Sequence, residues 1–141
     1  MRWSFGVLAC LMLTACGAPV RNEKLEAGYR LMAIDEPSML MICKLDKGGG
    51  CLESVPATIR AVGMDSRYIV AQQHAMDAPR TNYYFIDLNV PNSEINGVTG
   101  PLTQTQFEAK SRERDLPKLA WAVDGTYSLK RPFKLSNYDW P

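Results

Sequence analysis

The sequence predicts an α+β domain, mostly an antiparallel β-sheet meander of about five to seven strands, with one surface helix near residues 104–115. Between residues 28 and 88, short runs of apolar, aromatic and β-branched residues alternate with turn formers. The joints between these runs are too short for the crossovers of a parallel sheet, so consecutive runs should pair antiparallel. A later polar stretch carries the start and stop signals of a single helix.

Five runs predict strands, and they cover residues 29–34, 38–44, 57–62, 67–74 and 82–88. The segments "AIDEPS" and "GMDS" supply breaks, and the second is short enough for a hairpin between Val62 and Arg67. The run "NYYFIDL" is apolar on both sides. It therefore predicts a strand that is central in the sheet or covered by a helix.

The helix is predicted over residues 104–115, after a connection rich in Pro, Asn and Gly. Thr103 and Gln106 have the spacing of a capping box, and Leu116-Pro117 limits the far end. Its apolar residues are few, with Phe107 the largest, so the helix should dock on the surface by few side chains.

The segment "KLAWAVDGTYSLK" follows the helix and predicts a last pair of short strands turned by Asp124-Gly125.

The amino terminus has the pattern of a secretory signal, with Arg2 before an apolar run from Phe5 to Leu13. That run is shorter than the roughly 20 apolar residues that span a bilayer. Its end, Leu13-Thr14-Ala15-Cys16 followed by Gly17, resembles the lipobox of bacterial lipoproteins. The resemblance implies a mature chain that begins at Cys16 and is held on a membrane by lipid on that sulfur. An ordinary signal cut nearby, for example after Ala18, is the alternative.

By the sorting rule of that family, Gly17 after the lipidated cysteine favours the outer membrane of a Gram-negative cell. We therefore expect a lipid-anchored protein of the cell envelope that faces the periplasm. The predicted domain organisation is a signal peptide at residues 1–15, a tether at 16–27 and a single globular domain at 28–141. The polar stretch from Gly17 to Glu26 within the tether reaches about 30 Å.

The mature chain carries no net charge, because loss of Arg2 reduces the 16 basic residues to 15, which equals the number of acidic residues. Nucleic-acid binding needs a basic excess that displaces counterions from phosphates. We therefore expect no nucleic-acid partner.

Two cysteines remain after processing, because Cys10 leaves with the signal and Cys16 carries the lipid. In "MICKLDKGGGCLES", Cys43 and Cys51 could by spacing alone be a redox pair, metal ligands or a disulfide. An even pair in an oxidising compartment predicts a disulfide. A closed zinc site takes four ligands, and His74 is the single histidine, so we expect no metal.

The segments "VGMDSRYIVAQQH", "NYYFID" and "GPLTQTQF" together resemble a family of small bacterial lipoproteins of unknown function. The similarity covers residues 57–107, and it implies a fold and a location. It carries no catalytic residues to this chain.

The sequence contains none of the common nucleotide-binding, hydrolase or metalloprotease motifs. His74 has no nucleophile or carboxylate placed beside it by a motif, so we expect no catalytic residue, no cofactor and no enzyme activity. We expect a protein-binding module, for example an immunity or inhibitor protein, with Tyr138 and Trp140 as candidate contact residues. The alternative is a structural or accessory lipoprotein of an envelope assembly.

Overall fold

The structure, a computed structural model, describes residues 19, 21–90, 97–123 and 129–130. Within these residues the fold is α+β and mostly β, which confirms the predicted class. The elements are β1 (Arg21–Lys24), a 3-10 turn (Glu26–Gly28), β2 (Tyr29–Ala33), β3 (Met41–Leu45), β4 (Cys51–Val55), β5 (Ile59–Met64), β6 (Tyr68–His74), β7 (Thr81–Asp87), β8 (Val98–Leu102), α1 (Gln104–Arg114), β9 (Trp121–Val123) and β10 (Leu129–Lys130).

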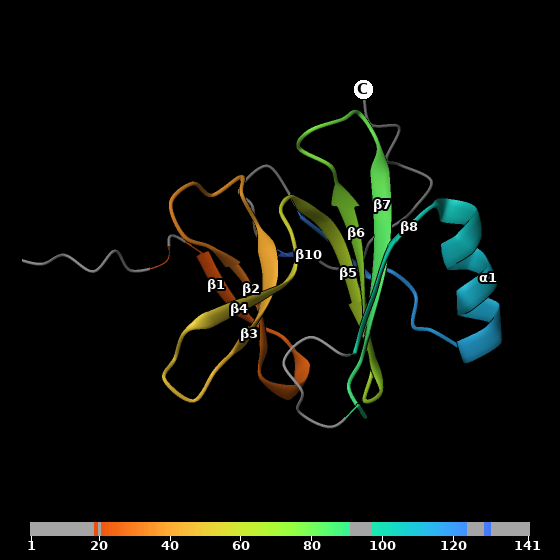
Figure 1. The fold of residues 1–141 in the computed structure, drawn as a ribbon, viewed down its shortest axis with the longest axis horizontal. Coiled ribbons are helices and arrows are strands. Elements are labelled where there is room, and N and C mark those ends of the chain that lie inside the picture. The colour runs from red at the N-terminus through yellow and green to blue at the C-terminus, as the bar shows by residue number, and fades with distance from the viewer. Residues whose placement is uncertain (1–18, 20, 91–96, 124–128, 131–141) are drawn as a thin grey trace, which may run out of the picture.

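The ten described strands form two sheets, where the sequence predicted one meander of five to seven strands. Sheet A has the order β1-β2-β3-β4, and sheet B has the order β10-β9-β5-β6-β7-β8. Neighbouring strands are antiparallel throughout. The chain passes from one sheet to the other between β4 and β5 (Figure 1).

One hydrophobic core lies between the two sheets. Sheet A contributes Leu31, Ile42 and Val55, and sheet B contributes Val62, Ile69 and Ile86, all with no more than 1% of their surface exposed. These residues alternate with outward-facing neighbours along each strand, as the two-residue period of a β-strand requires. Burial of this apolar surface is what holds the sheets together.

A second core lies on the other face of sheet B, where α1 packs (Figure 1). The Phe107 ring stacks on Tyr83 of β7, with 5.0 Å between ring centroids. Leu116 and Leu119, which follow the helix, are buried in the same cluster. The strand predicted to be central or covered by a helix is both, because β7 lies between β6 and β8 and under α1. The molecule thus has three layers: sheet A, sheet B and α1.

The passage between the sheets is fixed by buried hydrogen bonds. The Ile59 N–H donates to the Leu40 carbonyl at 2.8 Å, and the Gln73 side-chain amide donates to the Ala57 carbonyl at 2.7 Å. Gln73 is 4% exposed, and its own carbonyl oxygen accepts from Asn82 at 2.8 Å. Since a buried amide without partners is costly, this network specifies one arrangement of the corner.

The helix begins where the sequence predicts, with both bonds of the capping box present. The Gln106 N–H donates to Thr103 Oγ1 at 3.3 Å, and the Thr103 N–H donates to Gln106 Oε1 at 2.8 Å. Phe107 is the one buried residue of the helix, so the prediction of a surface helix docked by few side chains is confirmed.

Three strands were not predicted. Arg21–Lys24 lies inside the range 16–27 that the sequence assigned to a tether, yet it pairs along its length with β2. That part of the tether prediction was wrong, because an edge strand of a polar tetrapeptide carries no apolar alternation. Cys51–Val55 has one buried residue, Val55, and therefore no apolar alternation, and Val98–Leu102 contains a Gly-Pro pair that usually marks a loop.

Candidate interaction surface

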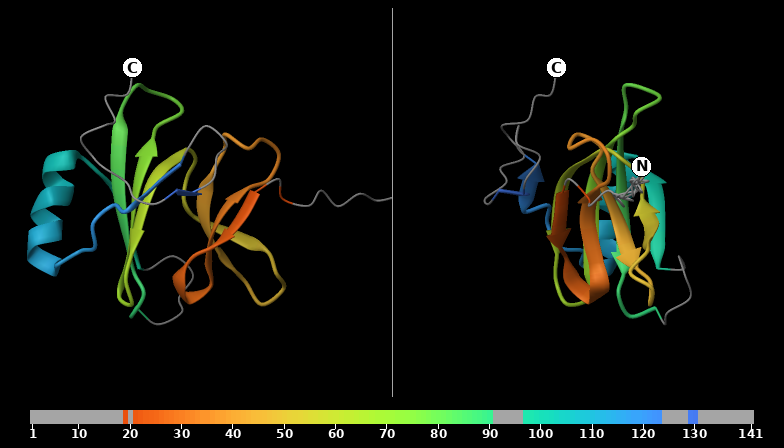
Figure 2. Two further views of the ribbon diagram at one scale, coloured as in Figure 1. Left: turned by 180° about the vertical axis from the view of Figure 1, so that it is seen from behind. Right: turned by 90° about the vertical axis from the view of Figure 1, so that its left-hand side faces the viewer.

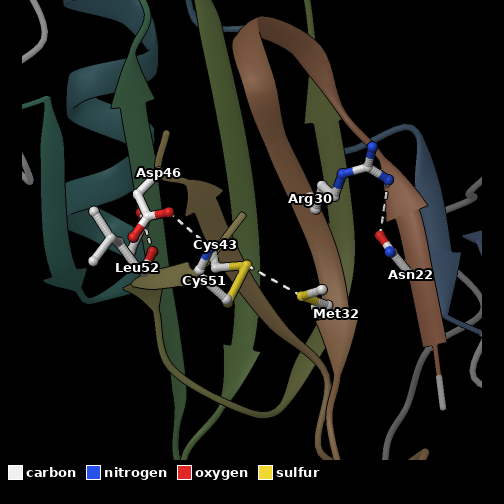
Figure 3. Close-up of a disulfide and its surroundings, with 9 residues drawn as sticks. Asn22, Arg30, Met32, Cys43, Asp46, Cys51 and Leu52 are labelled. Atoms are coloured by element: carbon white, nitrogen blue, oxygen red, sulfur yellow. Dashed lines mark hydrogen bonds between the residues drawn. A yellow bond between two sulfur atoms is a disulfide. The ribbon is translucent and has the colours of Figure 1, made fainter. Parts of the chain in front are cut away.

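The disulfide predicted between Cys43 and Cys51 is present, with 5.5 Å between the two Cα atoms. It joins β3 to β4 across a hairpin, and Figure 3 shows it beside Met32 of β2. Met32 Sδ lies 3.5 Å from Cys43 Sγ. The bond therefore closes a Gly-rich turn between successive strands.

The turn of this hairpin is ordered by Asp46. Its Oδ1 accepts from the Gly48 N–H at 2.8 Å and from the Gly50 N–H at 2.7 Å. The Asp46 N–H donates to the Gly50 carbonyl at 2.9 Å. Gly49 has φ +82°, a conformation that glycine adopts without steric cost. The hairpin is thus held at both ends, by the disulfide in the strands and by a carboxylate in the turn.

The strand register places a sulfur-rich set of side chains on the outer face of sheet A. Met32 lies opposite Met41, and Arg30 lies opposite Cys43, on the face away from Leu31 and Ile42 of the core. Met32 is 9% exposed and Cys43 is fully buried, while Met41 and Cys51 are partly exposed. We call this set the sheet A outer face.

Polar side chains of β1 and β2 border this face. Asn22 lies opposite Met32, and Lys24 lies opposite Arg30. Arg30 donates from Nη1 to Asn22 Oδ1 at 2.9 Å, as Figure 3 shows, and Lys24 is exposed. Glu23 of β1 lies opposite Leu31 on the other face of the sheet, and Glu53 of β4 lies opposite Cys43. The charged residues that β1 and β2 place on the sheet A outer face are therefore Lys24 and Arg30.

No described helix or strand covers the sheet A outer face (Figures 1 and 2). In the right-hand view of Figure 2 this face is turned toward the viewer, with sheet B and α1 behind it. Three large apolar side chains of the described chain are strongly exposed: Ile34 at 45%, Leu52 at 39% and Met76 at 62%. Ile34 directly follows β2, and Leu52 lies in β4, so two of the three belong to sheet A or its border.

His74 ends β6, where its backbone exchanges hydrogen bonds with Thr58 at 2.9 and 3.2 Å. Among the described residues, no three side chains of His, Cys, Asp or Glu are placed to hold a metal ion. The carboxylates of Asp65 and Asp87 accept backbone N–H groups, from Arg67 at 2.7 Å and from Asn89 at 3.0 Å. These carboxylates thus serve as turn caps.

Burial raises the pKa of the Tyr29 hydroxyl. It also raises the pKa of Tyr84, an effect that Glu53 adds to and Arg80 opposes. On α1, a hydrogen bond from Lys110 and then the charge of Lys110 lower the pKa of Glu113. Both tyrosines belong to the core and Glu113 to an exposed ion pair, so these shifts reflect packing and local charge.

Of the residues singled out in the sequence, Cys43 and Cys51 are brought together. Cys16, Tyr138 and Trp140 lie outside the described residues. The outer-face residues Lys24, Arg30 and Met41 were missed. The signal for them is that alternate residues of a strand lie on one face, here residues 22 and 24 of β1, 30 and 32 of β2, and 41 and 43 of β3. This signal identifies a common face only when the pairing of β1, β2 and β3 is known.

A family model described as a protein of unknown function (DUF3997) matches residues 26–120. This match covers more than half of the chain. The chain belongs to this family. The matched DUF3997 region spans sheet A from β2 onward, most of sheet B and α1.

Neither a search of curated proteins nor a search of solved structures found a match to this chain. The resemblance to small lipoproteins of unknown function is supported in its coarser part, a family of unknown function. No helix among the described residues is long and apolar enough to cross a membrane.

Proposed function

We propose that this DUF3997 protein is a lipid-anchored, non-enzymatic protein-binding module of the bacterial cell envelope, tethered through Cys16. The observation that carries the binding part is the β3–β4 hairpin. Its strands are joined by the Cys43–Cys51 disulfide and its turn is held by Asp46, so it presents one shape before any partner arrives. A preorganised element loses little conformational entropy on association.

The hairpin also lies at a free edge of sheet A. β4 pairs with β3 alone among the described strands, so one row of its backbone groups faces away from the sheet. An extended partner segment can add to such an edge through main-chain hydrogen bonds. Leu52 of β4 is 39% exposed and would supply an apolar contact beside that edge. The free edge of β4 and the exposed Leu52 side chain therefore support recognition of an extended partner segment by its shape and by one apolar contact.

The anchoring part of the proposal is supported by the match of residues 13–16 to a lipobox. Two or three acyl chains bind durably to a bilayer, whereas one binds marginally. A test is cell fractionation of the full chain and of Cys16→Ser. The wild-type chain should stay with the membranes after a salt wash, and Cys16→Ser should be soluble. A Cys16→Ser chain that remains with the membranes after the same wash would contradict anchoring at this cysteine.

The binding part is tested by cross-linking the full chain to its neighbours in intact envelopes and identifying them by mass spectrometry. Leu52→Arg places a charge at the hairpin edge, and we expect it to reduce recovery of a reproducible partner by about tenfold. Met76→Arg is the matched control, because Met76 is more exposed but belongs to the β6–β7 loop. No partner at all, or equal loss in both variants, would contradict binding through the hairpin.

An immunity or inhibitor protein is one form of this proposal, and a secreted toxin encoded beside the gene would support it. An accessory subunit of an envelope assembly is the other form. The two differ in their need for lipid: an accessory subunit loses its function in Cys16→Ala even when the soluble domain is abundant. Full function of that soluble domain would exclude the accessory form.

A further inference from the structure

We infer that the Cys43–Cys51 disulfide is a site of thiol–disulfide exchange, attacked at Cys51 by a dithiol protein, and that its reduction releases the outer part of β4 from sheet A. The oxidised chain presents the β4 edge to a partner, and the reduced chain withdraws it. This inference deepens the proposed function, because it rests on partner binding at that edge and names its regulation.

The outer part of β4 is held to sheet A by few side chains. Val55 is the one buried residue of β4, whereas five of the seven residues of β6 are buried. Val55 pairs with Ile42 and Glu53 pairs with Cys43, so Ser54 between them is an extra residue in the ladder. Such a bulge locally disrupts strand pairing. The part of β4 before this bulge therefore has no buried side chain of its own.

The turn of the hairpin adds little to this attachment, because residues 46–50 are all exposed. Water competes for the hydrogen bonds that Asp46 accepts from Gly48 and Gly50. Segments with exposed hydrogen bonds and few buried apolar contacts open at the lowest free energy, and consecutive glycines gain the most backbone freedom when released. The disulfide is thus the tie that keeps residues 46–53 on the sheet.

The two sulfur atoms differ in their access to an attacking thiol. Cys43 is fully buried, whereas Cys51 is partly exposed on the sheet A outer face, which no described element covers (Figure 2). The rate of exchange depends on which sulfur a thiolate can reach. Arg30 and Glu53 lie opposite Cys43 in the two neighbouring strands, so it has one cationic and one anionic neighbour in register. Access therefore selects Cys51 as the point of attack.

The exchange transfers two electrons and two protons to the hairpin. A thiolate of the dithiol protein attacks Cys51 Sγ, the bond to Cys43 Sγ breaks, and Cys43 leaves as a thiolate that takes up a proton. The second thiolate of the dithiol protein then forms its own disulfide and displaces Cys51, which is protonated in turn. Met32 Sδ lies 3.5 Å from Cys43 Sγ (Figure 3), so the buried Cys43 thiol finds an acceptor in place.

Amide hydrogen exchange of the full chain in mild detergent measures the opening, with dithiothreitol as the dithiol probe. We expect reduction to speed exchange in residues 46–53 by about tenfold or more and to leave β6 and β7 unchanged. Unchanged exchange in residues 46–53 would overturn the inference. A disulfide that dithiothreitol does not reduce in the folded chain, or faster exchange throughout both sheets, would overturn it too, since the bond would then be a staple of the whole fold.

The point of attack is mapped with glutathione, a monothiol, on the oxidised chain. After an acid quench, mass spectrometry should find the mixed disulfide on Cys51, because this residue is the accessible one. Recovery of glutathione on Cys43 alone would contradict the assignment of Cys51.

The double variant Cys43→Ala with Cys51→Ala is the matched control. Its residues 46–53 should exchange fast without reductant and should not respond to dithiothreitol. In envelope cross-linking we expect it to recover about tenfold less partner than the wild-type chain. Equal recovery would overturn the switch and leave the proposed binding intact. No partner for either chain would contradict the proposed binding itself, and the exchange measurement decides separately whether β4 opens.

Discussion

The outer faces of the two sheets differ, because α1 covers the outer face of sheet B and no described element covers that of sheet A. On sheet B, Tyr83 and Phe85 of β7 are buried under α1, and Phe107 completes the cluster. On sheet A, Met41 and Cys51 are partly exposed, with no described element over them. The difference begins in the strands: β7 is apolar on both sides, whereas β1 and β2 place Lys24 and Arg30 outward.

This comparison indicates which face is for stability and which is available for contact. A strand that is apolar on both sides must be covered, and the chain supplies the cover itself. A sheet whose outer face carries both polar and apolar side chains needs no covering layer. The partly exposed Met41 and Cys51 side chains of sheet A can adapt to an external surface. The disulfide then replaces some of the stability that a covering layer would give.

Removing the cover of sheet B should have the largest effect. Phe107→Ala deletes the ring that stacks on Tyr83, and we expect it to lower the free energy of unfolding by about 3 kcal/mol. Urea denaturation measures this, with Thr105→Ala on the exposed side of the same helix as control. A Phe107→Ala loss no larger than that of the control would mean that α1 does not close this face.

Opening the disulfide should weaken sheet A by a smaller amount. Closing a loop of nine residues removes about 2.6 kcal/mol of unfolded-state freedom on the chain-entropy model. The double variant Cys43→Ala with Cys51→Ala should therefore unfold at a lower urea concentration, and its free energy of unfolding should be lower by about this amount. Wild-type protein treated with a reductant provides the matched comparison. An unchanged midpoint in both samples would show that the hairpin needs no cross-link.

The helix cap should contribute less again. Thr103→Ala removes the oxygen that accepts the Gln106 N–H, and such a loss costs about 1 kcal/mol. Circular dichroism through urea denaturation measures the change. Thr105→Ala again controls for substitution on the helix. If both variants lose the same stability, the capping box is not what fixes the start of α1.

The smallest effect is expected at Glu113, an exposed residue whose pKa Lys110 lowers through a hydrogen bond of 2.7 Å. A carboxyl group with a lowered pKa favours the folded state above its unfolded-state pKa, and this contribution is lost as the pH falls through the folded-state pKa. NMR titration should find that Lys110→Met raises the pKa of Glu113 toward its ordinary value. Lys118→Met should leave the titration midpoint unchanged, and a midpoint that Lys110→Met does not move would contradict the pairing.

Much of sheet B and the helix could be predicted from the sequence, because their signals are local. The turn "GMDS" forms the β5–β6 hairpin, Thr103 and Gln106 form the capping box, and the segment after the helix forms the β9–β10 pair. The Asp124-Gly125 turn of that pair lies outside the described residues. The disulfide was predicted from the compartment that the amino terminus implies.

The division into two sheets and the identity of the open face could not be predicted in this way. β1 is "RNEK", which has no apolar period, and its place in sheet A is set by pairing with β2. Whether Leu31 or its neighbours Arg30 and Met32 face the core depends on the strand register. Register is a tertiary property, and a shift of one residue would turn every side chain of the strand to the other face. The shorter linker and the outer face therefore became visible only in the structure.

The central claim is that the outer face of sheet B is covered and that of sheet A is open. Hydroxyl-radical footprinting of the two faces tests it most directly. The Cys16→Ser chain in solution is exposed to hydroxyl radicals, and modification of Met41 on sheet A is compared with that of Phe85 and Phe107 on sheet B. We predict ready modification of Met41 and protection of both rings, after correction for the intrinsic reactivity of each residue type. Protection of Met41 equal to that of Phe85 would contradict the open face of sheet A.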